Sequence, residues 1–290
     1  MDAFMKFYEA VQKSRKLKKR EQIERRLEMA MRKAFREQGK QFVRGLARFK
    51  NRFTEAAQIK SMFGDDLSLT LPSPAGRGGM QLTEALVPTE WMFVFHMVAQ
   101  KTESLFSKPI DAAAQASLLQ GANAIIADVG MGIRFDLKNP KAVKYLDQYG
   151  AQQVTKINDT TRDYLQTIIK QATDEGWTYN RTAEAISARY KEFEIGKPQE
   201  HIDSRAHLIA VTETGNASLE GHMIVAQDLQ DAGVEMEKMW STVGDGKVSD
   251  GCKENEGQGW IALTSPFKSG HQRPLRFPGC RCDLLTRVKH

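Results

Sequence analysis

WSTVGDGKVSDGCKENEGQGWIALTSPFKSGHQRPLRFPGCRC, residues 240–282, contains all three cysteines of a 290-residue chain. They stand at Cys252, Cys280 and Cys282, within thirty-one residues of one another. Three cysteines are too few for a disulfide scaffold, and an odd number argues against a secreted, cross-linked domain. We therefore expect free thiols, held in a reducing cytosol during synthesis.

The cysteine spacing suggests a metal site. Cys280 and Cys282 form a C-x-C pair whose thiols can both reach one side of an extended segment. Cys252 would supply a third thiolate and His271 a nitrogen, which together make the Cys₃His set of closed structural zinc sites. The alternative is two or three free cysteines packed in a small core.

The sequence around the cysteines predicts a small module over residues 234–290. Strand-like stretches occur at 234–242, 260–263 and 282–288, and glycines and prolines are dense between them. A module of this size often needs a metal or a docked neighbour for stability.

Residues 84–233, which precede the module, are predicted to form a helical body. In the helix expected from about residue 202 to 231, Arg205, Ile209, Glu213 and Asn216 share one face. Buried polar groups need partners, so this face predicts a hydrogen-bond network that joins the helix to the module. A catalytic carboxylate at Glu213 is the alternative, but no second acid or base is suitably spaced.

The first 63 residues predict a basic helical arm, and residues 64–83, rich in Pro and Gly, a linker. Residues 1–60 hold 18 Lys and Arg against 7 Asp and Glu, a net charge of +11 in a chain whose total is +6. This asymmetry suggests a polyanion or an acidic protein surface as partner, with a solvated helix face as the alternative. The candidate contact residues are Lys13, Arg15, Lys16, Lys18, Lys19, Arg20, Arg25 and Arg26.

The predicted class is α+β, a mostly α-helical body with a small C-terminal, β-containing, loop-rich module. No membrane role is expected, because the longest apolar run, residues 91–99, is far shorter than the roughly 20 residues that cross a bilayer. The charged N-terminus does not predict a secretory signal.

The chain resembles the phage Mu protein F-like head morphogenesis family over roughly residues 130–288. The resemblance rests on an ordered series of residues: a Thr-Glu-Thr helix with a following Asn, then a tryptophan, a loop aspartate, a cysteine, a glycine turn and a Pro-rich stretch ending in Cys-Arg-Cys. Here these are Glu213, Asn216, Trp240, Asp245, Cys252, Gly257, Pro278, Cys280, Arg281 and Cys282. Many relatives have a histidine where this chain has Phe277, so the resemblance leaves His271 as the nitrogen ligand, or no tight metal site.

The resemblance implies a minor capsid protein of tailed phages. Such a protein would associate with the portal protein and other capsid components and with packaged double-stranded DNA, during procapsid assembly and DNA ejection. It would be located in the capsid interior, and in the host cytoplasm during assembly. Lys and Arg side chains of the arm would contact phosphates without reading sequence, or else an acidic portal surface.

The competing class is an enzyme, because domains of this family also occur fused to toxin domains. A metal-dependent nuclease would use Asp245, Asp250 and His271. The sequence contains no Gly-rich phosphate loop, no His-Glu-x-x-His and no nucleophile elbow. A free-standing DNA-binding regulator is disfavoured by the lack of a helix-turn-helix pattern. The sequence therefore predicts a structural protein.

Overall fold

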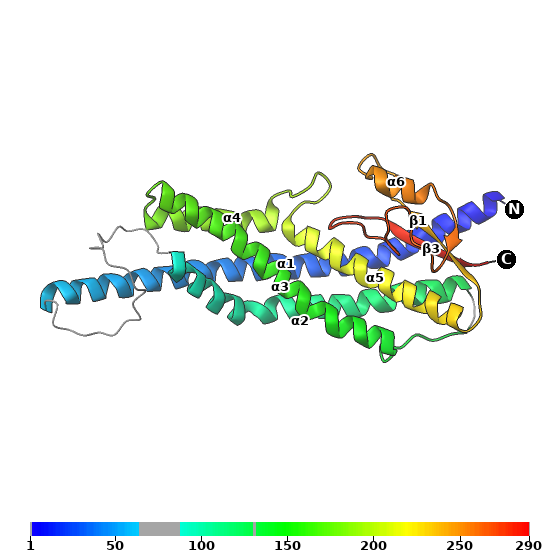
Figure 1. The fold of residues 1–290 in the computed structure, drawn as a ribbon, viewed down its shortest axis with the longest axis horizontal. Coiled ribbons are helices and arrows are strands. Elements are labelled where there is room, and N and C mark those ends of the chain that lie inside the picture. The colour runs from blue at the N-terminus through cyan, green and yellow to red at the C-terminus, as the bar shows by residue number, and fades with distance from the viewer. Residues whose placement is uncertain (1, 64–87, 130–131, 290) are drawn as a thin grey trace. The chain divides into compact units, whose positions relative to one another are not determined.

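The computed structural model describes residues 2–63, 88–129 and 132–289, with side chains at 18–48, 91–129, 132–149 and 152–289. Six helices and three short strands lie in these ranges (Figure 1). This confirms the predicted class, a mostly α-helical chain with a small β-containing C-terminal module. The predicted linker at 64–83 lies outside the described residues. The elements are α1 (Asp2–Phe63), α2 (Pro88–Val129), α3 (Pro140–Asp174), α4 (Tyr179–Ile195), α5 (Arg205–Asp231), β1 (Met236–Ser241), α6 (Asp250–Glu256), β2 (Ile261–Ala262) and β3 (Asp283–Val288).

Short polar residues and glycines set several helix ends. Pro140 opens α3 after Asn139, whose side chain accepts a hydrogen bond from the Lys141 amide at 2.9 Å. Gly176 follows α3 with a φ of 63°, a conformation that glycine adopts without strain. Ser204 caps α5 by accepting from the His207 amide at 3.0 Å.

The three strands form one antiparallel sheet in the order β2-β1-β3. Trp240 pairs with Leu284 across β1 and β3, and Lys238 pairs with Thr286. Met236, Lys238 and Trp240 alternate along β1 and are all buried, which is the pattern of a strand with one face on a core. A lysine in this buried row is unusual.

The chain divides into two compact units, and several helices contribute residues to both. The first unit comprises Met1–Ala34, Ser104–Thr155 and Glu192–His290. One of its cores joins α2 and α5 to the sheet. A second, under α5 and within the module, contains the three cysteines. The first core consists of Ala122, Ile125, Val225, Ala226, Leu229, Met236 and Leu263.

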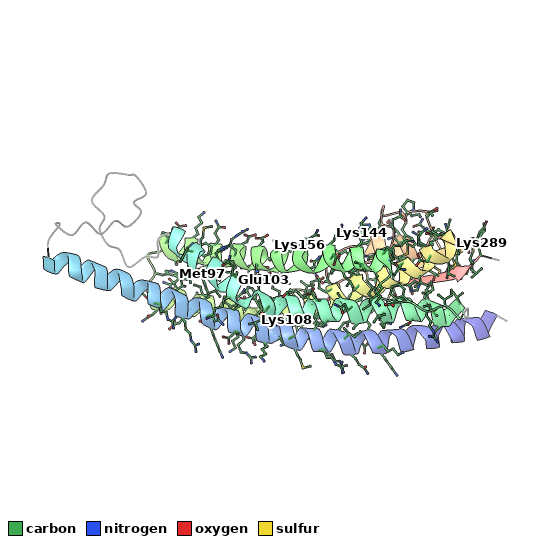
Figure 2. All side chains as sticks on the ribbon, turned by 90° about the horizontal axis from the view of Figure 1, so that it is seen from below. Met97, Glu103, Lys108, Lys144, Lys156 and Lys289 are labelled. Carbon is green, nitrogen blue, oxygen red and sulfur yellow. The ribbon has the colours of Figure 1, made fainter. Side chains whose placement is uncertain are left out.

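The second unit comprises Phe35–Glu103 and Lys156–Lys191. Phe42 and Leu46 of α1 are fully buried in it, and the Phe42 ring meets Phe95 of α2 edge-on. This part of α1 therefore contributes an apolar face to a packed core. Figure 2 shows the side chains along these helices, among them Met97 of α2, which is half exposed.

A buried polar network ties the second unit together. Gln38 of α1 is fully buried, and its Nε2 donates to Thr102 Oγ1 and to Asn158 Oδ1, both at 3.2 Å. The Tyr190 hydroxyl of α4 donates to Gln38 Oε1 at 3.5 Å. One amide thus connects four helices, and a fully bonded buried amide favours a single helix register.

No described helix is both long and apolar enough to cross a membrane.

Candidate metal centre

The structure brings the three cysteines together in the core of the module. Cys252 lies in the first turn of α6, Cys280 follows the Pro278-Gly279 turn, and Cys282 immediately precedes β3. Their Sγ atoms all lie within 4.8 Å of one another, with Cys252 and Cys280 3.9 Å apart. All three are buried free thiols.

These distances fit a thiolate-bound metal. Zinc binds thiolates at about 2.3 Å in a tetrahedron, which puts neighbouring sulfurs about 3.8 Å apart. The Cys252–Cys280 separation already matches that edge, and a small contraction would bring in Cys282. The donor set therefore suits a tetrahedral ion that takes three ligands from this chain.

Aromatic and aliphatic side chains enclose the thiols. Trp240 is fully buried beside them, and its ring meets Phe267 edge-on at a centroid distance of 5.1 Å. Leu219 of α5 and Leu284 of β3 complete the enclosure. Apolar surroundings exclude water, which strengthens electrostatic contacts to any charge held inside.

Hydrogen bonds lower the pKa of Cys280. The Cys282 thiol donates to the Cys280 sulfur, the backbone amides of Cys282 and Arg276 add further bonds, and the pKa of Cys280 falls to about 6 despite burial. The same pairing raises the pKa of Cys282. Hydrogen bonding therefore favours the thiolate form of Cys280, and amide donors of this kind orient metal-binding sulfurs.

Three side chains from residues 199–212 clamp the turn that carries Cys280. Gln199 Nε2 donates to the Pro278 carbonyl at 3.1 Å, and a ring nitrogen of His201 lies 3.0 Å from the Gly279 carbonyl. The Gly279 amide donates to Thr212 Oγ1 at 3.0 Å. Gly279 has a φ of 82°, and a Cβ there would come 2.6 Å from Gln199.

Two partly buried sets of hydrogen bonds fasten α6, which carries Cys252. Glu256 accepts from the Thr242 amide at 2.8 Å and from its hydroxyl at 2.7 Å. Asn255, fully buried, donates to Ser269 Oγ at 2.8 Å and accepts from the Ser269 amide at 3.1 Å. Sequence reasoning missed α6 because seven mostly polar residues have no clear periodicity.

His271 lies outside the sulfur group. Its Nδ1 is 3.0 Å from both the hydroxyl and the carbonyl of Ser269. Among the described residues, Cys252, Cys280 and Cys282 make the single group of three or more potential ligands close enough to share an ion. The predicted Cys₃His set is thus assembled as three cysteines without the histidine.

The carboxylates of the alternative nuclease site are engaged elsewhere. Asp245 accepts from Arg281 Nη2 at 2.5 Å, and this bond lowers the pKa of the Asp245 carboxyl. Asp250 pairs with Lys253 at 3.1 Å. In the part of the chain that the structure describes, Asp245, Asp250 and His271 do not form a shared metal site.

The polar face of α5 contacts the module through Arg273, which sequence reasoning did not single out. Arg273 pairs with Glu220 at 2.9 Å and donates to Asn216 Oδ1 at 3.3 Å. Glu213 is buried on the same face, and its charge and hydrogen bonding help to raise the pKa of Tyr149, after burial as the main cause. The stacked rings of Tyr145 and Tyr149 lie 4.7 Å apart beside it.

The predicted basic contact residues divide into three groups. The side chains of Lys13, Arg15 and Lys16 lie outside those described. Lys18, Lys19, Arg25 and Arg26 are exposed. Arg20 is buried and bonded to Glu24 at 3.1 Å, so it is withdrawn from any such surface: its position on the helix faces the core.

Two further residues of the family pattern, Gly257 and Pro278, lie in turns of the cysteine-bearing module. Gly257 ends α6, and its amide donates to the Lys253 carbonyl at 2.8 Å. Pro278 belongs to the clamped turn.

Comparison with known families gives one match. The model of the family described as Phage Mu protein F like protein matches residues 163–285, a range that includes α4, α5, β1, α6, β2, the start of β3 and all three cysteines. No curated protein and no solved structure matches the chain. The matched range covers α4, α5 and most of the cysteine-bearing module, and this part of the chain is similar to the phage Mu protein F-like family.

Proposed function

We propose that this chain is a structural component of phage head morphogenesis. The family match supports it directly, because it covers the region in which the module is fastened to α5. The observation that carries the proposal is the clamp on the Pro278-Gly279 turn, which joins the module to residues 199–212. Such fastening suits a rigid assembly part.

The proposal includes zinc as a structural ion. Three buried thiols with one depressed pKa favour a soft-ligand divalent metal over calcium or magnesium, which prefer oxygen. Cys252, Cys280 and Cys282 would hold it, with the fourth position filled from outside this sulfur group. Bound zinc would cross-link α6 to the start of β3, a stabilisation that small modules often require.

The proposed partners are the portal protein and other capsid components during procapsid assembly, and packaged double-stranded DNA. The proposed location is the capsid interior, and the host cytoplasm during assembly. The basic character of α1 supports a polyanionic or acidic partner.

The test is genetic and biochemical. A phage that carries this gene with an early stop codon should give defective heads, and the full chain supplied in trans should restore them. The chain should also co-purify with the portal and appear in purified procapsids by mass spectrometry. Normal infectious particles made without it, together with its absence from wild-type particles, would contradict the proposal.

A further inference from the structure

The exposed residues of α1 between Phe35 and Arg48 are all basic. Four positions in this stretch are exposed, and they are Arg36, Lys40, Arg44 and Arg48. The residues between them are buried or half-buried. We call these four residues the basic ridge. It differs from the exposed stretch at 18–29, where Glu21, Gln22 and Met29 separate the cations.

The packing of the opposite face fixes the orientation of the ridge. Phe35, Phe42 and Leu46 are fully buried, and Gln38 is bonded within the core of the second unit. Gly39 fits against Tyr190 so closely that a Cβ would stand 2.6 Å from the Tyr190 ring. The helix therefore cannot rotate to bury its cations, and the ridge faces outward.

Lys40, Arg44 and Arg48 have no ion-pair partner among the described residues. Glu37, three residues before Lys40, accepts a hydrogen bond from Gln41 at 2.8 Å. Like charges four residues apart destabilise a helix. The ridge carries that cost at each step, and an anionic partner would remove it.

The ridge has a regular geometry. Four residues of α-helix rise about 6 Å, so Arg36 to Arg48 span about 18 Å. The sequence places a further arginine, Arg52, at the next four-residue step within α1. An evenly spaced row of a single charge suits a linear polyanion.

We propose that the basic ridge is a sequence-independent binding surface for the phosphate backbone of duplex DNA, an inference that rests on the proposed role in the phage head. A protein partner is less well matched, because the cores of protein interfaces are depleted in charged residues overall and enriched in aromatic residues, methionine and arginine, and the ridge offers only the arginines of that set. No large apolar side chain is exposed between residues 35 and 48. Phosphate contacts need neither aromatic nor apolar groups.

The experiment measures binding of the full chain to a fluorescent 30-base-pair duplex by anisotropy across a series of salt concentrations. The variant is the triple substitution Lys40→Gln, Arg44→Gln and Arg48→Gln. Each phosphate contact contributes about 0.9 to the slope of log K against log salt. We expect at least a tenfold loss of affinity at about 0.1 M salt and a slope lower by about 2 to 3.

The matched control removes three exposed lysines from α3: Lys144→Gln, Lys156→Gln and Lys170→Gln (the first two are labelled in Figure 2). It should keep the wild-type slope. A ridge variant with unchanged affinity and slope, or a control that loses as much as the ridge variant, overturns the proposal. So does a wild-type chain that fails to bind DNA at low salt.

Capture of the portal protein, measured on the same variants, separates the two partner classes. Retained portal capture with lost DNA binding supports the ridge as a DNA surface, whereas the reverse assigns it to a protein. Procapsid incorporation of the ridge variant separates this inference from the proposed function. If the ridge variant loses DNA binding but still enters procapsids, the head role does not depend on the ridge. If the chain binds DNA but never enters heads, only the proposed head role is contradicted.

Discussion

Gly121 of α2 lies directly against the backbone carbonyl oxygen of Ser218 in α5. The contact is reciprocal, since Gly221 of α5 lies against the carbonyl oxygen of Leu118 in α2. A Cβ at either glycine would overlap main-chain atoms, which cannot move aside as a flexible side chain would. Two glycines thus allow the two backbones to approach this closely.

Gly121→Ala is therefore expected to destabilise the protein by about 3 kcal/mol or more, at the upper end of overpacking costs because backbone must shift. Urea unfolding followed by circular dichroism measures the change. Gly246→Ala is the control, because no atom lies within 4 Å of its added Cβ, and it should change stability by less than about 0.5 kcal/mol. Equal stability of the two variants would show that the helices do not pack this closely.

Metal content should depend on the cysteines and not on the histidine. Protein purified with zinc is expected to hold about one equivalent, and Cys280→Ser should lose it because two thiols cannot close the site. His271→Ala should retain it, since His271 lies outside the sulfur group. Elemental analysis measures both, and cobalt substitution should give thiolate charge-transfer bands in the wild type. Loss of metal from His271→Ala with retention in Cys280→Ser would contradict this assignment.

Lys238 should make stability rise with pH above neutrality. Burial lowers its pKa from 10.5 to about 8, although its Nζ donates to the carbonyl and the side chain of Gln272 at 2.8 and 2.9 Å. Between pH 8 and about 10.4 the unfolded chain binds the proton that the folded chain has released. The unfolded state then holds more protons, so the free energy of unfolding increases with pH in that window.

The measurement is urea unfolding at intervals from pH 7 to 9.5, where the buried tyrosines stay protonated. At each pH the free energy of unfolding of Lys238→Met is subtracted from that of the wild type. We expect this difference to increase by about 1–2 kcal/mol from the lowest to the highest pH. Parallel curves for the two proteins would show that Lys238 does not titrate there.

Gln38→Ala should destabilise the protein. The substitution removes the amide that bonds Thr102, Asn158 and Tyr190. These groups lose that hydrogen-bond partner, which should lower the free energy of unfolding by roughly 1–3 kcal/mol. Gln41→Ala, one turn later and bonded among the described residues only to Glu37, is the matched control and should cost under about 0.5 kcal/mol. Thermal unfolding distinguishes the two variants. An equal, small change in unfolding temperature in both would show that the network does not stabilise the fold.

The sequence predicted the elements that have strong local signals. The three strands lie in the predicted stretches around Trp240, Ile261 and Leu284. Helix α6 was missed because its residues are polar and few. The close approach of Gly121 to Ser218 was missed because it joins residues far apart in sequence, and a single glycine in a helical pattern does not reveal its neighbour.

The metal centre was also predictable only in part, because the positions of some of its residues depend on contacts between distant parts of the chain. The clustering of Cys252, Cys280 and Cys282 follows from spacing, but the position of His271 depends on how the Ser269 turn folds. Charge density alone predicts a contact surface at residues 13–26. Exposure depends on which face of α1 packs inward, and that buries Arg20 and presents Lys40, Arg44 and Arg48.

The clamp formed by Gln199, His201 and Thr212 has a spectroscopic consequence. Because it holds the turn before Cys280 from outside the module, any displacement of residues 199–212 would move one sulfur relative to the other two. The absorption bands of a cobalt-substituted centre would then change shape. When the chain binds a partner, the absorption spectrum of cobalt held by its thiols would report whether residues 199–212 have moved.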